Sequence, residues 1–263
     1  MMFNLKAETF GSVTLIEGDC YEIMDTFYPY QFDLAIPDVD YGLNVTKMPF
    51  TKRTVMPVKQ KNGKSLNVRK SEYKQKDWDL KTPGLSYFEK LFDVSVHQII
   101  WGIDYLDIPD IGNGRIKWDK CVPEKLSFKG FERAYCSLLD SEIDIKLLWS
   151  GFRQAKSLEE PTIQQGNKKL NEKRIHPTQK PVLLYKRLLL DYAKPGWRIL
   201  DTHGGSMSLA IACFDLGYEV VIIEKDPDYF ADGRGRLINH IKNNNGIKLL
   251  CDPDSLTIKS FID

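Results

Sequence analysis

The strongest constraint on the fold is the alternation of short apolar runs with amphipathic segments in the second half of the chain. Residues 197–201 and 219–223 have the composition of buried strands, and residues 181–192, 206–216 and 227–240 carry apolar side chains at helical spacing. Strands that alternate with helices pair in parallel, and the helices pack on both faces of the sheet. The pattern therefore predicts a doubly wound, mostly parallel α/β sheet.

The first half of the chain contains the same alternation. Apolar runs at 13–16 and 32–36 each end at a polar loop, and an amphipathic helix at 84–94 precedes a strand at 98–102. A chain of 263 residues with 42% hydrophobic residues has the size and composition of one globular domain. We therefore expect a single domain over residues 1–263, with two additions to its sheet.

Two segments interrupt the alternation. Residues 43–83 hold eleven Lys/Arg against three Asp/Glu, a local excess that the net charge of +1 conceals. We interpret this segment as a basic, mobile loop, which is either a solvated surface or a contact for an anionic partner. Residues 121–175 contain a polar tract and one strand candidate, 145–149, and we expect them to form an insertion at the rim of the sheet.

The composition argues against several other classes of protein. The longest apolar runs are a few residues, far below the roughly 18 to 20 needed to cross a bilayer, so no membrane partner is expected. The first residues lack the apolar segment of a secretory signal, which favours the cytoplasm. The five cysteines have no two-residue spacing and the four histidines are scattered, so we expect reduced thiols and no metal site.

A strand followed by two adjacent glycines and a helix forms the first candidate binding site. Asp201 ends the strand, Gly204 and Gly205 form the turn, and Ser206 begins the helix. Small residues let the backbone approach a ligand, and a helix N-terminus offers unpaired amide donors, as nucleotide sites require. Met207 stands where the dinucleotide fingerprint has a third glycine, so a plain tight connection stays open as an alternative.

Glu224 ends the next apolar strand, about 20 residues beyond the glycine turn. A carboxylate at the tip of the second strand can accept both hydroxyls of a ribose, and nucleoside-binding α/β folds place an acid there. An acid also commonly closes a strand that binds nothing. The two features together favour a nucleoside-containing ligand.

A third motif gives these features a context. It reads Asp38-Val39-Asp40-Tyr41-Gly42, and an intact His176-Pro177-Thr178-Gln179-Lys180-Pro181 element precedes the glycine turn. With the glycine turn, Glu224-Lys225-Asp226 and Gly18-Asp19-Cys20, the chain resembles the S-adenosylmethionine-dependent DNA amino-methyltransferases of the permuted β class. The order of motifs agrees, because the catalytic motif comes first and the glycine motif comes near the C-terminus. The segments 98–102 and 118–120 are also similar to small phage-type members.

The resemblance implies a Rossmann-like methyltransferase domain with S-adenosylmethionine as cofactor and double-stranded DNA as partner, and it leaves a homodimer open. It implies methyl transfer to the N6 amine of adenine, after the base is rotated out of the duplex. The catalytic residues it implies are Asp38, Val39, Asp40 and Tyr41. The cofactor residues it implies are Asp19, Cys20, Asp38, Thr178, Lys180, Asp201, His203, Gly204, Gly205, Ser206, Glu224 and Lys225.

The chemistry explains why such residues are needed. An exocyclic amine is a poor nucleophile because its lone pair is delocalised into the ring, so a catalyst must accept its two N–H bonds. Asp38 and the backbone carbonyl of Val39 can do so, and Tyr41 can stack on the flipped base. By the same resemblance, Glu224 would bind the ribose of the cofactor, Asp19 and Cys20 its adenine edge, and Thr178 with Lys180 its methionine carboxylate.

The catalytic motif departs from the Asp-Pro-Pro-Tyr of the family at both prolines. Val39 and Asp40 loosen the backbone there, and Asp40 adds a negative charge beside Asp38. Two interpretations follow, an active enzyme and a catalytically silent DNA-binding protein of the same fold. A nicotinamide-dependent oxidoreductase is a weaker alternative, since the three-glycine fingerprint is missing.

The sequence also limits the target atom. Methylation at cytosine C5 needs a cysteine that follows a proline in its family, and no cysteine here does. An acid rather than serine at the start of the catalytic motif resembles the adenine-N6 branch, and cytosine N4 is the alternative. Within this resemblance, segment 43–83 would contact DNA phosphates and segment 121–175 would recognise the target sequence.

Overall fold

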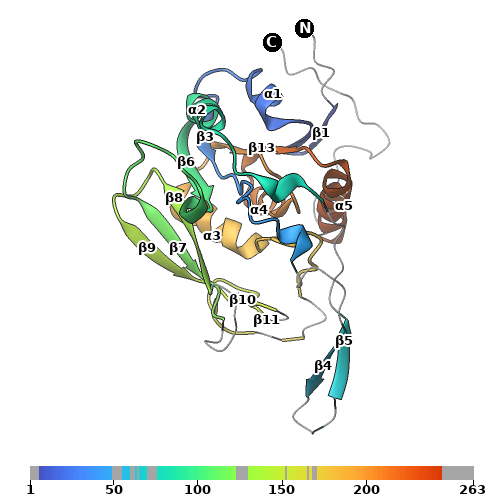
Figure 1. Ribbon diagram of the computed structural model, residues 1–263. Helices are drawn as coiled ribbons and strands as arrows, with labels where there is room; N and C mark the ends of the chain where they lie inside the picture. Colours follow the sequence, from blue (N-terminus) through green and yellow to red (C-terminus); the bar gives the residue numbers. More distant parts are fainter. Residues whose placement is uncertain are drawn as a thin grey trace.

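The computed structural model describes residues 6–48, 55–59, 63, 65–69, 76–122, 130–151, 153–164, 166–167 and 171–244. Nine strands form one sheet in the order β1-β2-β13-β12-β3-β6-β8-β7-β9 (Figure 1). Their bounds are β1 Lys6–Phe10, β2 Val13–Glu17, β3 Phe32–Ala35, β6 Ser95–Trp101, β7 Arg115–Asp119, β8 Phe131–Cys136, β9 Glu142–Lys146, β12 Arg198–Asp201 and β13 Glu219–Glu224. The helices are α1 Cys20–Met24, α2 Leu85–Val94, α3 Val182–Tyr192, α4 Ser208–Leu216 and α5 Pro227–Asn243.

The five central strands, β2, β13, β12, β3 and β6, are parallel to one another, as the alternation predicts. Strands β12 and β3 lie side by side although about two thirds of the chain separates them in sequence. From β12 the chain runs through α4 to β13 on one side, and from β3 it runs through α2 to β6 on the other. This reversal of direction opens a crevice at the carboxyl ends of the two strands, where such folds bind ligands.

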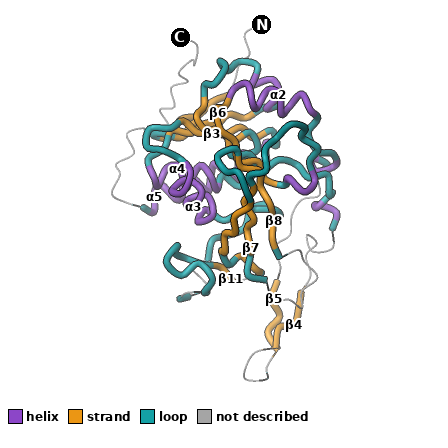
Figure 2. The backbone as a smooth tube through the Cα atoms, turned by 90° about the vertical axis from the view of Figure 1, so that its left-hand side faces the viewer, coloured by secondary structure: helices purple, strands orange, loops and turns teal. Residues whose placement is uncertain are grey.

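Helices cover both faces of the sheet, which confirms the doubly wound arrangement (Figure 2). Successive strand residues point to opposite faces, so Ile199 packs in the cluster under α3, α4 and α5 while Leu200 packs in the cluster under α1 and α2. Both residues are fully buried. Continuous apolar runs are therefore required in these strands, in place of the alternation typical of a half-exposed sheet.

Antiparallel pairs lie on both sides of the central strands, although the edge strand β9 is parallel to β7. The sequence alternation missed most of these outer strands. β1 pairs with β2 on one side, and β8 lies between β6 and β7 on the other, antiparallel to both. The expected insertion at 121–175 is thus only partly outside the sheet, because β8 and β9 complete it. The expected strand 145–149 is also wrong in its bounds, since β9 ends at Lys146 and a short hairpin of β10 (Trp149–Ser150) and β11 (Arg153–Gln154) begins three residues later.

The basic segment is not simply a loop. Within it, β4 (Val55–Lys59) and β5 (Ser65–Arg69) form an antiparallel hairpin, and the 3₁₀ helices η1 (Val45–Lys47) and η3 (Trp78–Leu80) lie on either side of it in the sequence. In both views the hairpin projects away from the body of the sheet (Figures 1 and 2). No helix in the described part of the chain has the length and apolarity needed to cross a membrane.

Candidate active site

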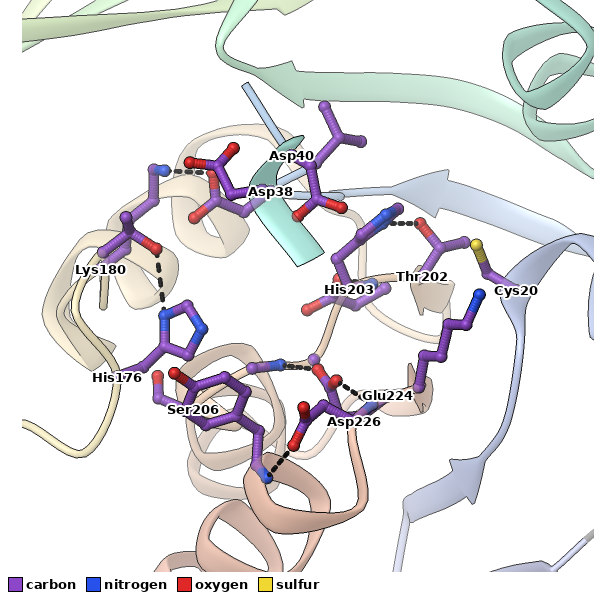
Figure 3. Close-up of a pocket in the computed structure, with 18 of the residues that line it drawn as sticks. Cys20, Asp38, Asp40, His176, Lys180, Thr202, His203, Ser206, Glu224 and Asp226 are labelled. Atoms are coloured by element: carbon purple, nitrogen blue, oxygen red, sulfur yellow. Dashed lines mark hydrogen bonds and ion pairs between the residues drawn. The ribbon is translucent and has the colours of Figure 1, made fainter. Parts of the chain in front are cut away.

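A cavity of about 510 Å³ lies at the carboxyl ends of β2, β3, β12 and β13. Figure 3 shows polar and charged side chains at or just after the ends of these four strands, and His176 and Lys180 from the segment before α3, arranged around its open centre. Every site residue that the sequence predicted lines this cavity. They are Asp19, Cys20, Asp38, Val39, Asp40, Tyr41, Thr178, Lys180, Asp201, His203, Gly204, Gly205, Ser206, Glu224 and Lys225.

The glycine turn forms one wall of the cavity, and its glycines are required by packing. A Cβ at Gly204 would lie 2.5 Å from the Ile222 side chain, and Gly205 has a φ of +48°. Met207 is fully buried with a φ of +59°, and α5 makes room for its side chain at Gly233. Because the backbone of Met207 has a left-handed conformation, it cannot be part of α4. The helix therefore begins at Ser208, whereas the sequence predicted a start at Ser206.

Glu224 holds the turn from the neighbouring strand. Its carboxylate accepts the backbone N–H of Gly205 at 2.6 Å and that of Asp226 at 2.7 Å. The two bonds fix the carboxylate at the cavity wall, and each oxygen keeps a lone pair that can accept a further bond. Asp226 in turn caps α5 by accepting the N–H of Asp228 and Tyr229.

Asp19 and Cys20 start helix α1 just after β2, beside the end of β13. Asp19 caps the helix through the backbone N–H of Tyr21 and pairs with the Lys225 ammonium at 2.6 Å. Lys225 itself is largely exposed, with 75% of its side chain accessible, so it lies at the rim of the cavity. Burial raises the pKa of the Cys20 thiol to about 12, which keeps it protonated and unreactive.

Two histidines of the cavity are neutral. Burial lowers the pKa of His176 to about 3 and that of His203 to about 4. His176 Nδ1 lies 3.0 Å from the Thr178 hydroxyl, and His203 Nδ1 lies 2.9 Å from the Thr202 hydroxyl. Both histidines therefore line the cavity as polar, uncharged side chains. Among the described residues, no group of three His, Cys, Asp or Glu side chains is arranged to hold a metal ion.

The catalytic motif enters the cavity just after β3. The Tyr41 hydroxyl donates to Asp38 Oδ1 at 2.7 Å, and the Lys180 ammonium contacts the same oxygen. Burial raises the pKa of Asp38, and the charge of Lys180 opposes this shift. The resemblance assigned Lys180 to the methionine carboxylate of the cofactor. In the structure its ammonium is directed at the carboxylate of Asp38 (Figure 3).

The Tyr41 ring has its own support. It stacks on Tyr105 with 5.2 Å between ring centroids and 14° between planes, and a Cβ at Gly102 would lie 2.0 Å from the Tyr41 ring. Gly102 has a φ of +83°, so glycine is needed there for both conformation and space. Tyr41 is therefore held in a fixed orientation in the DNA-free protein.

Asp79 secures the loop that follows the catalytic motif. This buried carboxylate accepts four backbone N–H groups, from Tyr41 at 3.0 Å, Gly42 at 2.8 Å, Leu43 at 3.4 Å and Val45 at 3.0 Å. These bonds fix the backbone directly after Val39 and Asp40, the two positions that lack the prolines. Asp79 thus restrains the backbone that follows the motif, which the missing prolines were expected to leave loose.

The cavity concentrates carboxyl groups. Burial, followed by the Asp79, Glu224 and Asp38 carboxylates, raises the pKa of Asp40 to about 8. Burial likewise raises the pKa of Asp201 to about 8 and that of Glu224 to about 7. Carboxyls crowded in this way favour a cationic ligand, which would let them ionise together.

Sequence reasoning missed three residues that the structure brings to the site, Asp79, Glu132 and Tyr105. Asp79 lies in the basic segment 43–83, Tyr105 lies outside every motif just past the expected strand 98–102, and Glu132 lies in β8, which was not expected. Burial acts to raise the pKa of Glu132, but the ammonium groups of Lys120 and Lys180 overcome it and lower this pKa to about 2. No local pattern marks these residues, because long-range contacts give them their roles.

Comparison with known proteins identifies the class. A family model for N6/N4 methyltransferases, described as DNA methylase, matches residues 40–233, about three quarters of the chain. The chain therefore belongs to this family of DNA methylases. Most of the motifs that line the cavity, from Asp40 to Tyr229, lie within the matched range.

Several solved structures match the chain at low sequence identity. The complex of M1.HpyAVI with SAM has 18% identity and a TM-score of 0.49, over 85% of this chain and 99% of that one. The cytosine-N4-specific PvuII DNA methyltransferase has 11% identity and a TM-score of 0.49, over 91% and 96%. A putative DNA modification methylase from Thermus thermophilus has 14% identity and a TM-score of 0.43, over 88% and 95%.

Proposed function

We propose that this protein is a DNA methyltransferase that uses S-adenosylmethionine to methylate the N6 amine of adenine. The observation that carries the proposal is the position of Asp38 in the same cavity as the glycine turn and Glu224. A methyl donor held against the turn and an amine held by Asp38 would share one enclosed space. The order of the motifs along the chain supports membership of the permuted β class.

The residues of the cavity fit the cofactor. Gly204 allows the backbone to come close, Glu224 is fixed where it can accept ribose hydroxyls, and Asp19 and Cys20 line the cavity beside it. The crowded carboxylates suit a cationic sulfonium. When bound, S-adenosylmethionine supplies an electrophilic methyl group on that sulfonium.

Asp38 and the Val39 carbonyl activate the amine. The amine nitrogen must become pyramidal to use its lone pair, and acceptors for both N–H bonds favour that geometry. In the described part of the chain, the hydrogen bonds to Asp38 all use Oδ1, so Oδ2 can accept from a substrate. Asp79 fixes the following backbone, which supports an active enzyme over a silent DNA-binding protein.

Tyr41 provides the stacking surface for the flipped base. A base inside a duplex cannot reach the cavity, so it must rotate out, and an aromatic face replaces about 1 to 3 kcal/mol of lost stacking. The ring of Tyr41 is already oriented by its bond to Asp38 and by Tyr105. This prior ordering lowers the entropic cost of holding the base.

The DNA partner is contacted by the two segments outside the parallel sheet. The projecting hairpin lies in the basic segment 43–83, whose charge suits phosphates. Segment 121–175, which carries the β10–β11 hairpin, is the target-recognition segment in this proposal. Adenine N6 is favoured over cytosine N4 because the catalytic motif begins with Asp38 and not with serine.

The test is methylation of unmethylated genomic DNA by purified protein with S-adenosylmethionine, followed by digestion to nucleosides and mass spectrometry. N6-methyladenine is the expected product, and the D38A variant is expected to form none. N4-methylcytosine would keep the enzyme class but overturn the target base. The absence of both products from DNA, with cofactor binding shown separately by calorimetry, would overturn the proposed function and favour the silent DNA-binding protein.

A further inference from the structure

A buried row of alternating charges extends from the cavity into the antiparallel side of the sheet. The Lys180 ammonium, with 2% of its side chain exposed, contacts Asp38 on one side and lies 3.0 Å from Glu132 on the other. Glu132 also pairs with Lys120. The row therefore runs Asp38, Lys180, Glu132, Lys120, and each charge faces one of opposite sign.

The four residues come from four different elements. Asp38 follows β3, Lys180 immediately precedes α3, Glu132 lies in β8 and Lys120 follows β7. The Lys180 ammonium also lies 5.0 Å from the centre of the buried Trp101 ring in β6. Burying charges is costly unless they are paired, so a row that spans the fold in this way points to a role at the cavity.

The contacts of Asp38 indicate what that role is. The Lys180 ammonium and the Tyr41 hydroxyl both donate to Oδ1 of Asp38. The Lys180 Nζ lies 3.0 Å from the Tyr41 hydroxyl oxygen. Two donors on one oxygen fix the rotation of the carboxylate about its χ angles. In this orientation Oδ2 is the oxygen offered to the substrate amine.

We propose that Lys180 is a positioning residue that acts through Asp38, and that Glu132 supplies the counter-charge that makes a buried lysine compatible with methyl transfer. The proposal rests on the methyltransferase function proposed above. It differs from the expectation that Lys180 binds the cofactor carboxylate, because its ammonium is already shared between two buried carboxylates.

The need for Glu132 follows from the charge that develops during the reaction. The amine nitrogen gains positive charge as it takes the methyl group, and an uncompensated ammonium beside Asp38 would oppose this. Glu132 offsets the charge of Lys180, so Asp38 acts on the amine as an effective anion. Lys120 holds Glu132 in place from the far end of the row.

The decisive variant is Glu132→Gln, which keeps shape and removes one charge. Its kcat is expected to fall at least tenfold, with the dissociation constant for S-adenosylhomocysteine within threefold of wild type. The acidic limb of the kcat profile should move to lower pH, because an uncompensated Lys180 stabilises ionised Asp38. The other titratable groups that interact with Asp38 are Lys180, Tyr41, Tyr185, Asp40 and Asp201, and all are unchanged in this variant.

A second variant separates this proposal from the cofactor role. Lys180→Met is expected to lose kcat but to bind S-adenosylhomocysteine within threefold of wild type, whereas a lysine that binds the cofactor carboxylate would cost tenfold or more. The matched control is Glu219→Gln, since Glu219 pairs with Arg198 at 3.6 Å at the amino ends of β13 and β12, away from the cavity and from both proposed DNA-contacting segments. Thermal unfolding verifies that each variant is folded.

The outcomes distinguish the two proposals. An unchanged kcat and pH profile for Glu132→Gln, or a tenfold loss of S-adenosylhomocysteine binding for Lys180→Met, overturns the positioning role even if wild type methylates DNA. If wild type methylates no DNA, the proposed function fails, and calorimetry on Lys180→Met still decides whether this lysine binds the cofactor.

Discussion

The carboxylate of Asp79 accepts the backbone N–H of Gly42 at 2.8 Å, across 37 positions of sequence. Tyr41, Leu43 and Val45 donate to the same carboxylate, so one side chain orders the whole turn after the catalytic motif. Where the family uses prolines to restrict the backbone from within, this chain restricts it from a distant 3₁₀ helix. Both the prolines and Asp79 restrict the backbone next to Tyr41.

Asp79→Ala should therefore impair catalysis and stability together. Four amides lose their acceptor, which we expect to lower the free energy of unfolding by about 3 kcal/mol and kcat by about tenfold or more. Urea unfolding and steady-state kinetics measure the two effects. Asp77→Ala is the control, because Asp77 pairs only with exposed Lys47 among the described contacts. A variant with normal kcat would show that the turn is ordered without Asp79.

Asp38→Asn tests the role of the catalytic carboxylate. The amide keeps the shape of the side chain but loses the negative charge that the amine requires, so kcat should fall by about a hundredfold or more. Binding of S-adenosylhomocysteine, measured by calorimetry, should change by less than about threefold. Asp25→Asn, at an exposed ion pair with Lys90, serves as the control. Loss of binding in place of loss of turnover would contradict this role for Asp38.

The sequence predicts the centre of the fold well, because buried parallel strands and amphipathic helices each carry a local signal. Ile199 and Leu200 show this, since both are apolar and each packs on a different face. The antiparallel strand β8 carries Glu132, Arg133 and Tyr135, so its pattern is ambiguous until its neighbours are known. Residues of the site that sit on motifs were predicted, whereas Asp79 contacts backbone 34 or more residues away and Glu132 reaches the site through Lys180, which is also distant in the sequence.

The crowded carboxylates predict an unusual pH dependence of stability. Burial raises the pKa of Asp40 and Asp201 to about 8, far above the value of about 4 in an unfolded chain. Between these values the folded protein retains protons that the unfolded chain has lost, so the ligand-free protein should lose stability as pH rises from about 5 to about 8. Thermal unfolding at several pH values measures this trend. A stability that rises over this range would contradict it.

The same carboxylates predict how pH affects the choice of ligand. As they ionise, the cavity gains negative charge, which favours the sulfonium of S-adenosylmethionine over the neutral sulfur of S-adenosylhomocysteine. The ratio of the two affinities should shift toward S-adenosylmethionine by about tenfold between about pH 6 and about pH 9. Calorimetry with both ligands measures the ratio, in which shared pH effects cancel. A constant ratio would show that these carboxylates do not face the sulfur.

Gly204→Ala tests the packing of the glycine turn. The added Cβ would lie 2.5 Å from Ile222 and 3.1 Å from the Met207 sulfur, so the turn must shift at a cost of about 1 to 3 kcal/mol. S-adenosylhomocysteine should bind at least tenfold more weakly, as calorimetry would reveal. Gly112→Ala is the matched control, since a Cβ there meets no atom within 4 Å. Equal stability and binding in both variants would argue against a close-packed turn, whereas a loss confined to Gly204→Ala assigns the cofactor wall to this glycine.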